Sequence, residues 1–137
     1  MATQSTAARQ NNSLINLPSN PIGYLVILAA VITGVIHLLL GPQVMGFSQL
    51  LGVLFILNGV GFLGGTVLYL TNYWRSELYF VAAGYAIATI LGLFMFQGFS
   101  IEAFYMNGDL NPMAVVSKAA EAVIALGTLY LHSNTSA

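Results

Sequence analysis

The stretch NPMAVVSKAAEAVIALGTLYL, residues 111–131, has the length of a membrane-spanning helix but carries two charged side chains. A helix that crosses the hydrocarbon core of a bilayer needs about 20 predominantly apolar residues. Asn111 can cap such a helix, and Pro112 suits its first turn, where no backbone N–H is needed. At about 1.5 Å per residue, Lys118 lies about 10 Å and Glu121 about 15 Å below the surface where the helix begins.

The spacing of Lys118 and Glu121, three residues apart, places both side chains on one helix face. A charged side chain near the bilayer centre costs about 2.5–3.5 kcal/mol on insertion scales, so both should face the bundle interior or a wet cavity. Two interpretations follow. The residues form a proton, ion or ligand site, or they form an intramembrane pair that fixes the position of the helix.

Composition predicts a single all-α domain that lies in the membrane. Of 137 residues, 58% are hydrophobic and 5% are charged, against about 25% charged in soluble domains. The net charge of −1 gives no reason to expect nucleic acid as a partner. The absence of cysteine excludes disulfides, thiolate metal sites, iron–sulfur clusters and cysteine nucleophiles.

Hydropathy predicts a four-transmembrane-helix up-down bundle within residues 21–132. Gly41-Pro42 is expected to end the first helix, and a short interfacial helix is plausible over residues 101–106. Residues 1–20 and 133–137 are expected to be polar tails. The predicted spans are about 22–40, 48–70, 77–96 and 112–131.

The few charges outside the spans predict an orientation. Arg9 and Arg75 lie on the side of both termini, whereas Glu102 and Asp109 lie on the other side. The positive-inside rule then places both termini in the cytoplasm of a multi-pass plasma-membrane protein. Six aromatic residues are expected to form an interfacial belt on the Arg75 side. They are Tyr24, Tyr69, Tyr73, Trp74, Tyr79 and Tyr130.

Each predicted helix carries at least one polar side chain between the midplane and the Glu102/Asp109 side, while the opposite half is almost entirely apolar. This asymmetry predicts an interior polar cluster that opens, if anywhere, toward that side. Its expected members are His37, Asn58, Tyr85, Lys118 and Glu121. Small residues that permit close helix contact are expected to dock helices or a partner. They are Gly61 and Gly65 in one helix, and Gly84, Ala88 and Gly92 in the next.

The cluster is compatible with several chemistries. A metal site is not predicted, because one His and one Glu do not make the paired Glu-x-x-His motifs of dinuclear bundles. Haem held by two histidines fails because His37 and His132 lie at opposite membrane faces. A quinone or lipid pocket fits, because His and Tyr can bond a quinone carbonyl while glycine-lined walls take the tail. A proton path would use Glu121 as relay, although the neighbouring Lys118 would hold that carboxylate ionised.

Three runs stand out in the first three predicted helices: GVIHLLLG (34–41), LGVLFILNGVGFLGGTVLYL (51–70) and NYWRSELYFVAAGY (72–85). They resemble a group of small four-helix archaeal membrane proteins that is best represented in haloarchaea. The resemblance covers about half of the chain. It implies an archaeal source and a fold, and no activity.

With no catalytic motif, the sequence favours a non-catalytic accessory subunit of a larger membrane complex, of respiratory or monooxygenase type. The expected partners are the lipid bilayer and other membrane subunits. One alternative is a small proton- or solute-conducting protein that acts as a homo-oligomer. Another is a quinone- or lipid-binding membrane enzyme.

Overall fold

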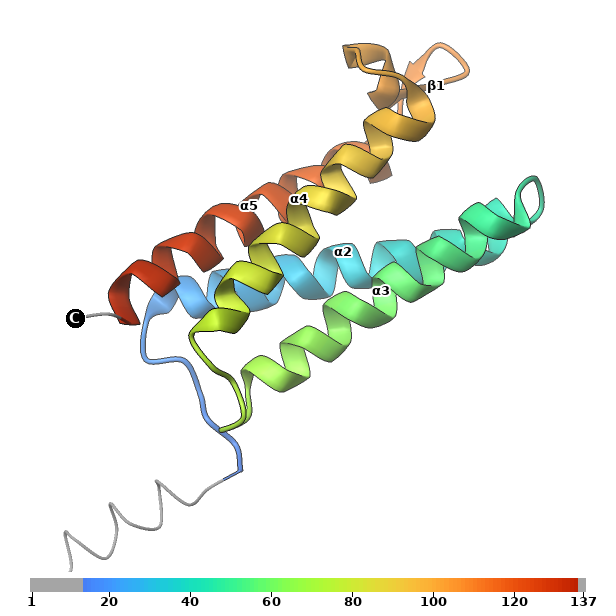
Figure 1. Cartoon of the computed structure of the whole chain (residues 1–137). Helices are drawn as coiled ribbons and strands as arrows, with labels where there is room; N and C mark the ends of the chain where they lie inside the picture. Colours follow the sequence, from blue (N-terminus) through green and yellow to red (C-terminus); the bar gives the residue numbers. More distant parts are fainter. Residues whose placement is uncertain (1–13, 136–137) are drawn as a thin grey trace, which may run out of the picture.

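The structure is a computed structural model that describes residues 14–135 of the chain. Its four long helices are α2 (Pro21–Met45), α3 (Gln49–Tyr69), α4 (Glu77–Gln97) and α5 (Pro112–Thr135) (Figure 1). Each of them is long and apolar enough to cross a bilayer. The prediction of an all-α, multi-pass membrane bundle is confirmed.

The N-terminal ends of three helices are capped by side chains that accept a backbone N–H. Asn20 Oδ1 accepts from the Ile22 N–H at 2.9 Å, and Ser48 Oγ accepts from the Leu51 N–H at 3.2 Å. Asn111 Oδ1 accepts from the Met113 N–H at 3.2 Å, as the sequence predicts.

The expected end of the first helix at Leu40 is wrong, because α2 runs through Pro42 to Met45. A proline within a helix removes one backbone hydrogen bond. Here it does so near the C-terminal end of α2, where packing against α3 continues. A Cβ placed on Gly41 would lie 2.5 Å from the side chain of Ile56, so the two helices stay in close contact at this level.

The helices associate as two antiparallel pairs, α2 with α3 and α4 with α5, and the pairs meet mainly through α2 and α5. Figure 1 shows the pairs crossing near the chain termini and diverging toward the links at 46–48 and 98–111. Glycines allow the close contact of α2 with α3, since a Cβ on Gly59 would lie 2.7 Å from the Gly34 carbonyl oxygen. By contrast, α3 and α4 face each other across a gap that side chains bridge.

Part of the predicted N-terminal tail is ordered against the bundle. Ile15 forms an antiparallel bridge with Thr71, and the Asn16 N–H donates to the Leu70 carbonyl at 2.6 Å. Residues 14–20 therefore run beside the α3–α4 link. The remainder of the predicted tail, including Arg9, lies outside the described residues.

The link between α4 and α5 contains a short 3₁₀ helix (Ile101–Phe104) and then a hairpin, whereas the sequence suggested one interfacial helix over residues 101–106. Strands β1 (Tyr105–Met106) and β2 (Asp109–Leu110) flank an Asn-Gly turn. Asn107 and Gly108 have positive φ angles of 55° and 85°, as a type I′ turn requires. The hairpin therefore replaces the second half of the expected helix.

The end of the bundle near Arg75 has an aromatic cluster. The rings of Tyr69, Trp74 and Tyr79 meet edge to face, with centroid separations of 5.0 to 6.0 Å. Three of the six residues expected in the interfacial belt therefore pack together where α3, the α3–α4 link and α4 meet.

Candidate functional site

The charged residues of α5 meet two polar residues of α2 inside the bundle. Glu121 is fully buried, and its two carboxylate oxygens have different partners. Oε1 accepts from Lys118 Nζ at 2.9 Å within α5, and Oε2 accepts from the Thr33 hydroxyl at 2.5 Å across the α2–α5 contact. His37 lies one turn after Thr33, and its Nδ1 is 3.9 Å from Glu121 Oε2.

The two hydrogen bonds of Glu121 stabilise different parts of the structure. The pair with Lys118 lies within one helix, so it can form whenever α5 is helical and lowers the cost of placing both charges in the membrane. The bond from Thr33 joins two helices, so it forms only when α2 and α5 pack. Thr33 thus connects the buried ion pair to the fold.

A second polar group connects α3 and α4 across their gap. The Tyr85 hydroxyl donates to the Asn58 carbonyl oxygen at 3.0 Å, and the Thr89 hydroxyl donates to Asn58 Oδ1 at 3.0 Å. Gly61 provides the space for this bridge, because a Cβ there would collide with the Tyr85 hydroxyl. The Phe62 ring supports Tyr85 edge to face at 4.9 Å.

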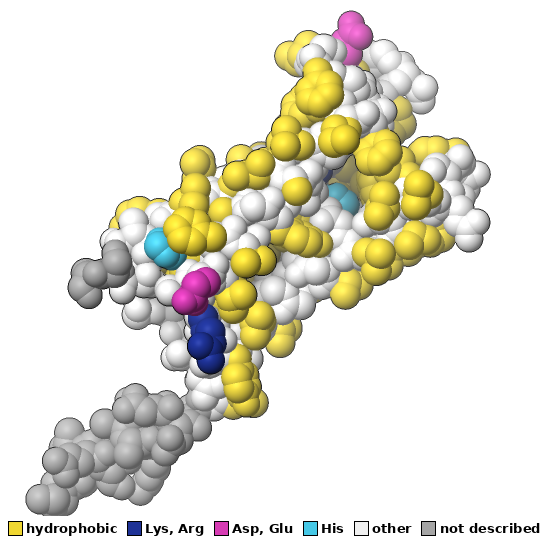
Figure 2. Space-filling model, viewed as in Figure 1, with side chains coloured by type: hydrophobic (Ala, Val, Ile, Leu, Met, Phe, Trp, Pro, Cys, Tyr) yellow, Lys and Arg dark blue, Asp and Glu magenta, His cyan; other side chains and the backbone are white. Residues whose placement is uncertain are grey.

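Both polar groups contribute to the wall of one cavity of about 320 Å³ between α3 and α4. His37, Lys118, Asn58, Tyr85 and Thr89 line it together with apolar side chains of the two helices. Figure 2 shows the surface hollowed between the diverging helix pairs, with apolar side chains around the opening. A site of this composition has apolar walls and a few converging polar groups, as small-molecule sites do.

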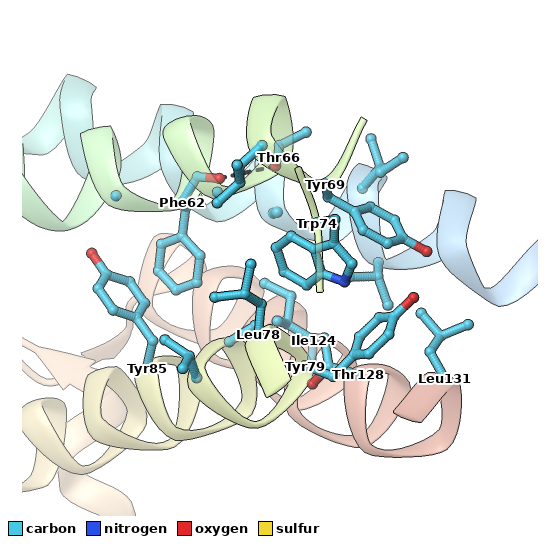
Figure 3. A pocket seen from close by; sticks show the side chains of 18 residues that line it. Phe62, Thr66, Tyr69, Trp74, Leu78, Tyr79, Tyr85, Ile124, Thr128 and Leu131 are labelled. Atoms are coloured by element: carbon cyan, nitrogen blue, oxygen red, sulfur yellow. Dashed lines mark hydrogen bonds between the residues drawn. The ribbon is translucent and has the colours of Figure 1, made fainter. Parts of the chain in front are cut away.

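A second cavity, of about 160 Å³, continues along the same gap toward the aromatic end (Figure 3). Its lining is almost entirely apolar and includes Ile124, Leu78 and the ring of Trp74. Tyr85 lines both cavities, so the two adjoin at its side chain. We call the first the polar cavity, after the few polar side chains in its mainly apolar wall, and the second the apolar cavity.

Four of the five predicted cluster residues line one cavity, and the fifth, Glu121, is buried behind Lys118, with which it is paired. The five residues belong to two separate hydrogen-bonded groups. His37, Lys118 and Glu121 form the first group, and Asn58 and Tyr85 form the second. Sequence reasoning missed Thr33. The available signal was its position four residues before His37, which puts both on one face of a helix. Threonine in a membrane helix often bonds its own backbone, which hides such a role.

The predicted packing glycines differ in their surroundings. Gly61 is in contact with Tyr85, whereas a Cβ on Gly65, Gly84 or Gly92 would meet no atom within 4 Å. Gly65 lines the apolar cavity and Gly92 lines the polar cavity, as does Ala88. The close contacts between helices come instead from glycines of α2 and α3 and from Gly127 of α5, which contacts Val26.

Within residues 14–135, no three His, Asp or Glu side chains lie close enough together to bind a metal ion. The acidic residues of the 98–111 link lie apart from His37 and Glu121. The cavity wall therefore offers hydrogen-bonding side chains, and Lys118 is the member of the buried ion pair that reaches it.

Comparison with known proteins identifies the family of this chain. Residues 8–132 match the model of DUF7475, a family of unknown function. The chain belongs to this family. The match covers the first three long helices, nearly all of α5 and both polar groups. Neither the curated proteins nor the solved structures contain a match to this chain.

Proposed function

We propose that the protein is a membrane-embedded binding subunit that holds an amphiphilic molecule, a quinone or a lipid, between α3 and α4. The observation that supports this function is the polar cavity of about 320 Å³, which has His37 and Lys118 in its wall. Small-molecule sites range from about 300 to 1,000 Å³ and combine apolar walls with a few polar groups. In a bilayer, polar groups left open to hydrocarbon cost several kcal/mol each, so an occupant that bonds them is favoured.

The shape of the gap supports an amphiphile over a compact polar solute. A head group would lie in the polar cavity, and a chain would pass Tyr85 into the apolar cavity lined by Trp74. Because the gap lies between two membrane helices, such a molecule reaches it from the bilayer without crossing water. The role needs no catalytic residue in this chain.

Native mass spectrometry of the protein, released from mild detergent, tests this function. Gly92→Phe fills the polar cavity, since a Cβ at this position meets open space and the residue lines the cavity. Gly84→Phe is the matched control on the same helix, because Gly84 is equally unhindered but lies outside both cavity walls. Wild type and Gly84→Phe are expected to carry one lipophilic molecule per chain, and Gly92→Phe none. Wild-type protein without such a molecule, or equal occupancy in Gly92→Phe, contradicts the proposal.

A role as an accessory subunit of a larger membrane complex, of respiratory or monooxygenase type, is compatible with ligand binding. The exposed backbone of α4 at Gly84 supports it, because an uncovered glycine permits close approach of a partner helix. On a native gel of source membranes, wild type should migrate with larger subunits and Gly84→Phe should not. Migration of wild type alone contradicts this second role.

Conduction by a homo-oligomer has less support. The buried polar side chains in residues 14–135 are Thr33, His37, Ser117, Glu121 and Thr128. The Thr128 hydroxyl donates to the Ile124 carbonyl of its own helix, so it adds no link from Glu121 toward the aromatic end. A flux in liposomes that Glu121→Gln abolishes would restore this alternative.

The positive-inside rule supports a plasma-membrane orientation with both termini in the cytoplasm, and the resemblance to haloarchaeal proteins supports an archaeal source. The cysteine-free chain allows a direct test. A single cysteine at Asn107, in the exposed hairpin, should react with an impermeant maleimide added outside intact cells. A cysteine at the exposed Tyr73 should not react. The reverse labelling pattern contradicts the orientation.

A further inference from the structure

The direction of the hydrogen bonds at His37 fixes which nitrogen carries its proton. His37 Nδ1 lies 2.8 Å from the backbone carbonyl oxygen of Thr33. A carbonyl oxygen can only accept, so Nδ1 must carry the hydrogen. Nδ1 is also 3.2 Å from the Thr33 hydroxyl oxygen, whose own hydrogen is directed to Glu121. In the neutral imidazole, Nε2 is therefore a hydrogen-bond acceptor.

The charges around His37 favour this neutral form. Glu121 is already paired with Lys118 at 2.9 Å, so the two charges cancel. A proton on Nε2 would place a second cation beside a single carboxylate inside the bundle, and an uncompensated buried charge is strongly unfavourable. No residue between 14 and 135 hydrogen-bonds to Nε2, although the His37 ring lines the polar cavity.

A hydrogen-bond donor, Lys118, lines the same cavity as this acceptor. The Lys118 ammonium has three N–H donors, and Glu121 Oε1 takes one of them. Lys118 lines the same cavity as His37, and both approach the same buried carboxylate. The cavity thus presents an acceptor without a partner and a donor with spare hydrogens, on a site whose net charge is zero.

From this pairing, and resting on the proposed binding function, we infer that the head of the ligand carries a neutral hydroxyl group that donates to His37 Nε2 and accepts from Lys118. A hydroquinone ring and the free hydroxyl of a diacylglycerol both have this chemistry. An oxidised quinone presents only carbonyl lone pairs to Nε2. An ionised phosphate or carboxylate head likewise has no hydrogen to donate to Nε2. It would also add a negative charge that the already neutral Lys118–Glu121 pair does not balance.

Binding of matched probes to the full-length protein tests the inference. Trp74 is the only tryptophan of the protein, and it lines the apolar cavity. Its fluorescence therefore reports entry of the alkyl chain of a probe into that cavity. The probes are a decyl-substituted hydroquinone, its dimethyl ether, the oxidised quinone and didecanoylglycerol. The hydroquinone or didecanoylglycerol should bind at least about tenfold more tightly than the ether and the quinone, which corresponds to about 1.4 kcal/mol. Whichever hydroxyl compound binds more tightly identifies the source of the head group.

His37→Phe removes the acceptor and keeps an aromatic ring beside Phe55, whose centroid lies 5.2 Å away. This variant should bind all four probes equally, whereas His132→Phe, at the other end of the bundle, should keep the wild-type preference. If His37→Phe does not fold, the comparison of hydroxyl and ether on wild type decides alone. If the wild-type protein binds the hydroxyl compounds, the dimethyl ether and the quinone equally tightly, the inference about the hydroxyl group is wrong. The proposal that the protein binds an amphiphile is then unaffected. Failure of every probe to bind, together with an empty native mass spectrum, overturns the binding function itself.

Discussion

Replacing Thr33 by Val removes the hydroxyl that joins α2 to the buried carboxylate while keeping the shape of the side chain. Glu121 then loses the donor at 2.5 Å, and its Oε2 stays buried without that partner. Leaving a buried acceptor unsatisfied costs about 1–3 kcal/mol in proteins, and more when the group is charged. Interhelical hydrogen bonds in membranes average only about 0.6 kcal/mol, with a maximum near 1.7, because the separated helices find other partners.

The Thr33 bond should lie at the upper end of the membrane range, because its acceptor is charged and fully buried. We expect Thr33→Val to lower the free energy of unfolding by about 1–1.7 kcal/mol. Reversible unfolding in mixed micelles of mild detergent and dodecyl sulfate measures this quantity.

Thr128→Val is the matched control. Thr128 is equally buried, but its hydroxyl donates to the Ile124 carbonyl of its own helix at 2.7 Å. Its replacement should change the free energy of unfolding by less than about 0.5 kcal/mol, because the Ile124 carbonyl keeps its helical backbone partner and no hydrogen bond between helices is lost. Equal losses in the two variants would refute the reasoning, since both threonines would then contribute in the same way.

Two further predictions use the same unfolding measurement. Glu121→Gln leaves the Lys118 ammonium without its carboxylate and should cost about 1–3 kcal/mol, and adding Lys118→Met should recover at least half of the loss. A double variant no more stable than Glu121→Gln alone would contradict the pairing. Gly59→Ala drives a Cβ toward a backbone carbonyl of α2 and should cost about 1–3 kcal/mol. Gly64→Ala meets open space and should instead be neutral or stabilising by up to about 1 kcal/mol, because alanine favours a helix; the opposite order would refute the α2–α3 contact.

The fold could be predicted from the sequence because membrane helices are encoded by long apolar stretches and little else. The second span ends within one residue of its predicted bounds, and so does the third. The first span was misjudged because Gly41-Pro42 is a local signal for a helix end, whereas packing against Ile56 of α3 keeps α2 helical to Met45. At this position, packing between α2 and α3 outweighs the tendency of Gly-Pro to end a helix.

The candidate site was predictable in composition and depth but not in its connections. Counting residues along each helix placed Lys118, Glu121 and Asn58 at related levels in the membrane. Rotation about the helix axes decides which side chains meet, and the sequence does not encode it in a readable way. For this reason the division into an α2–α5 group and an α3–α4 group, with a cavity between them, required the structure.

The most direct test of the central claim is an electron density map of wild-type protein crystallised from a lipidic mesophase that contains the decyl hydroquinone. We predict elongated density between α3 and α4, with its head at His37 and Lys118 and its chain running past Tyr85 toward Trp74. A map in which α3 and α4 close directly on each other, or in which a helix of another chain fills the gap, would contradict the claim.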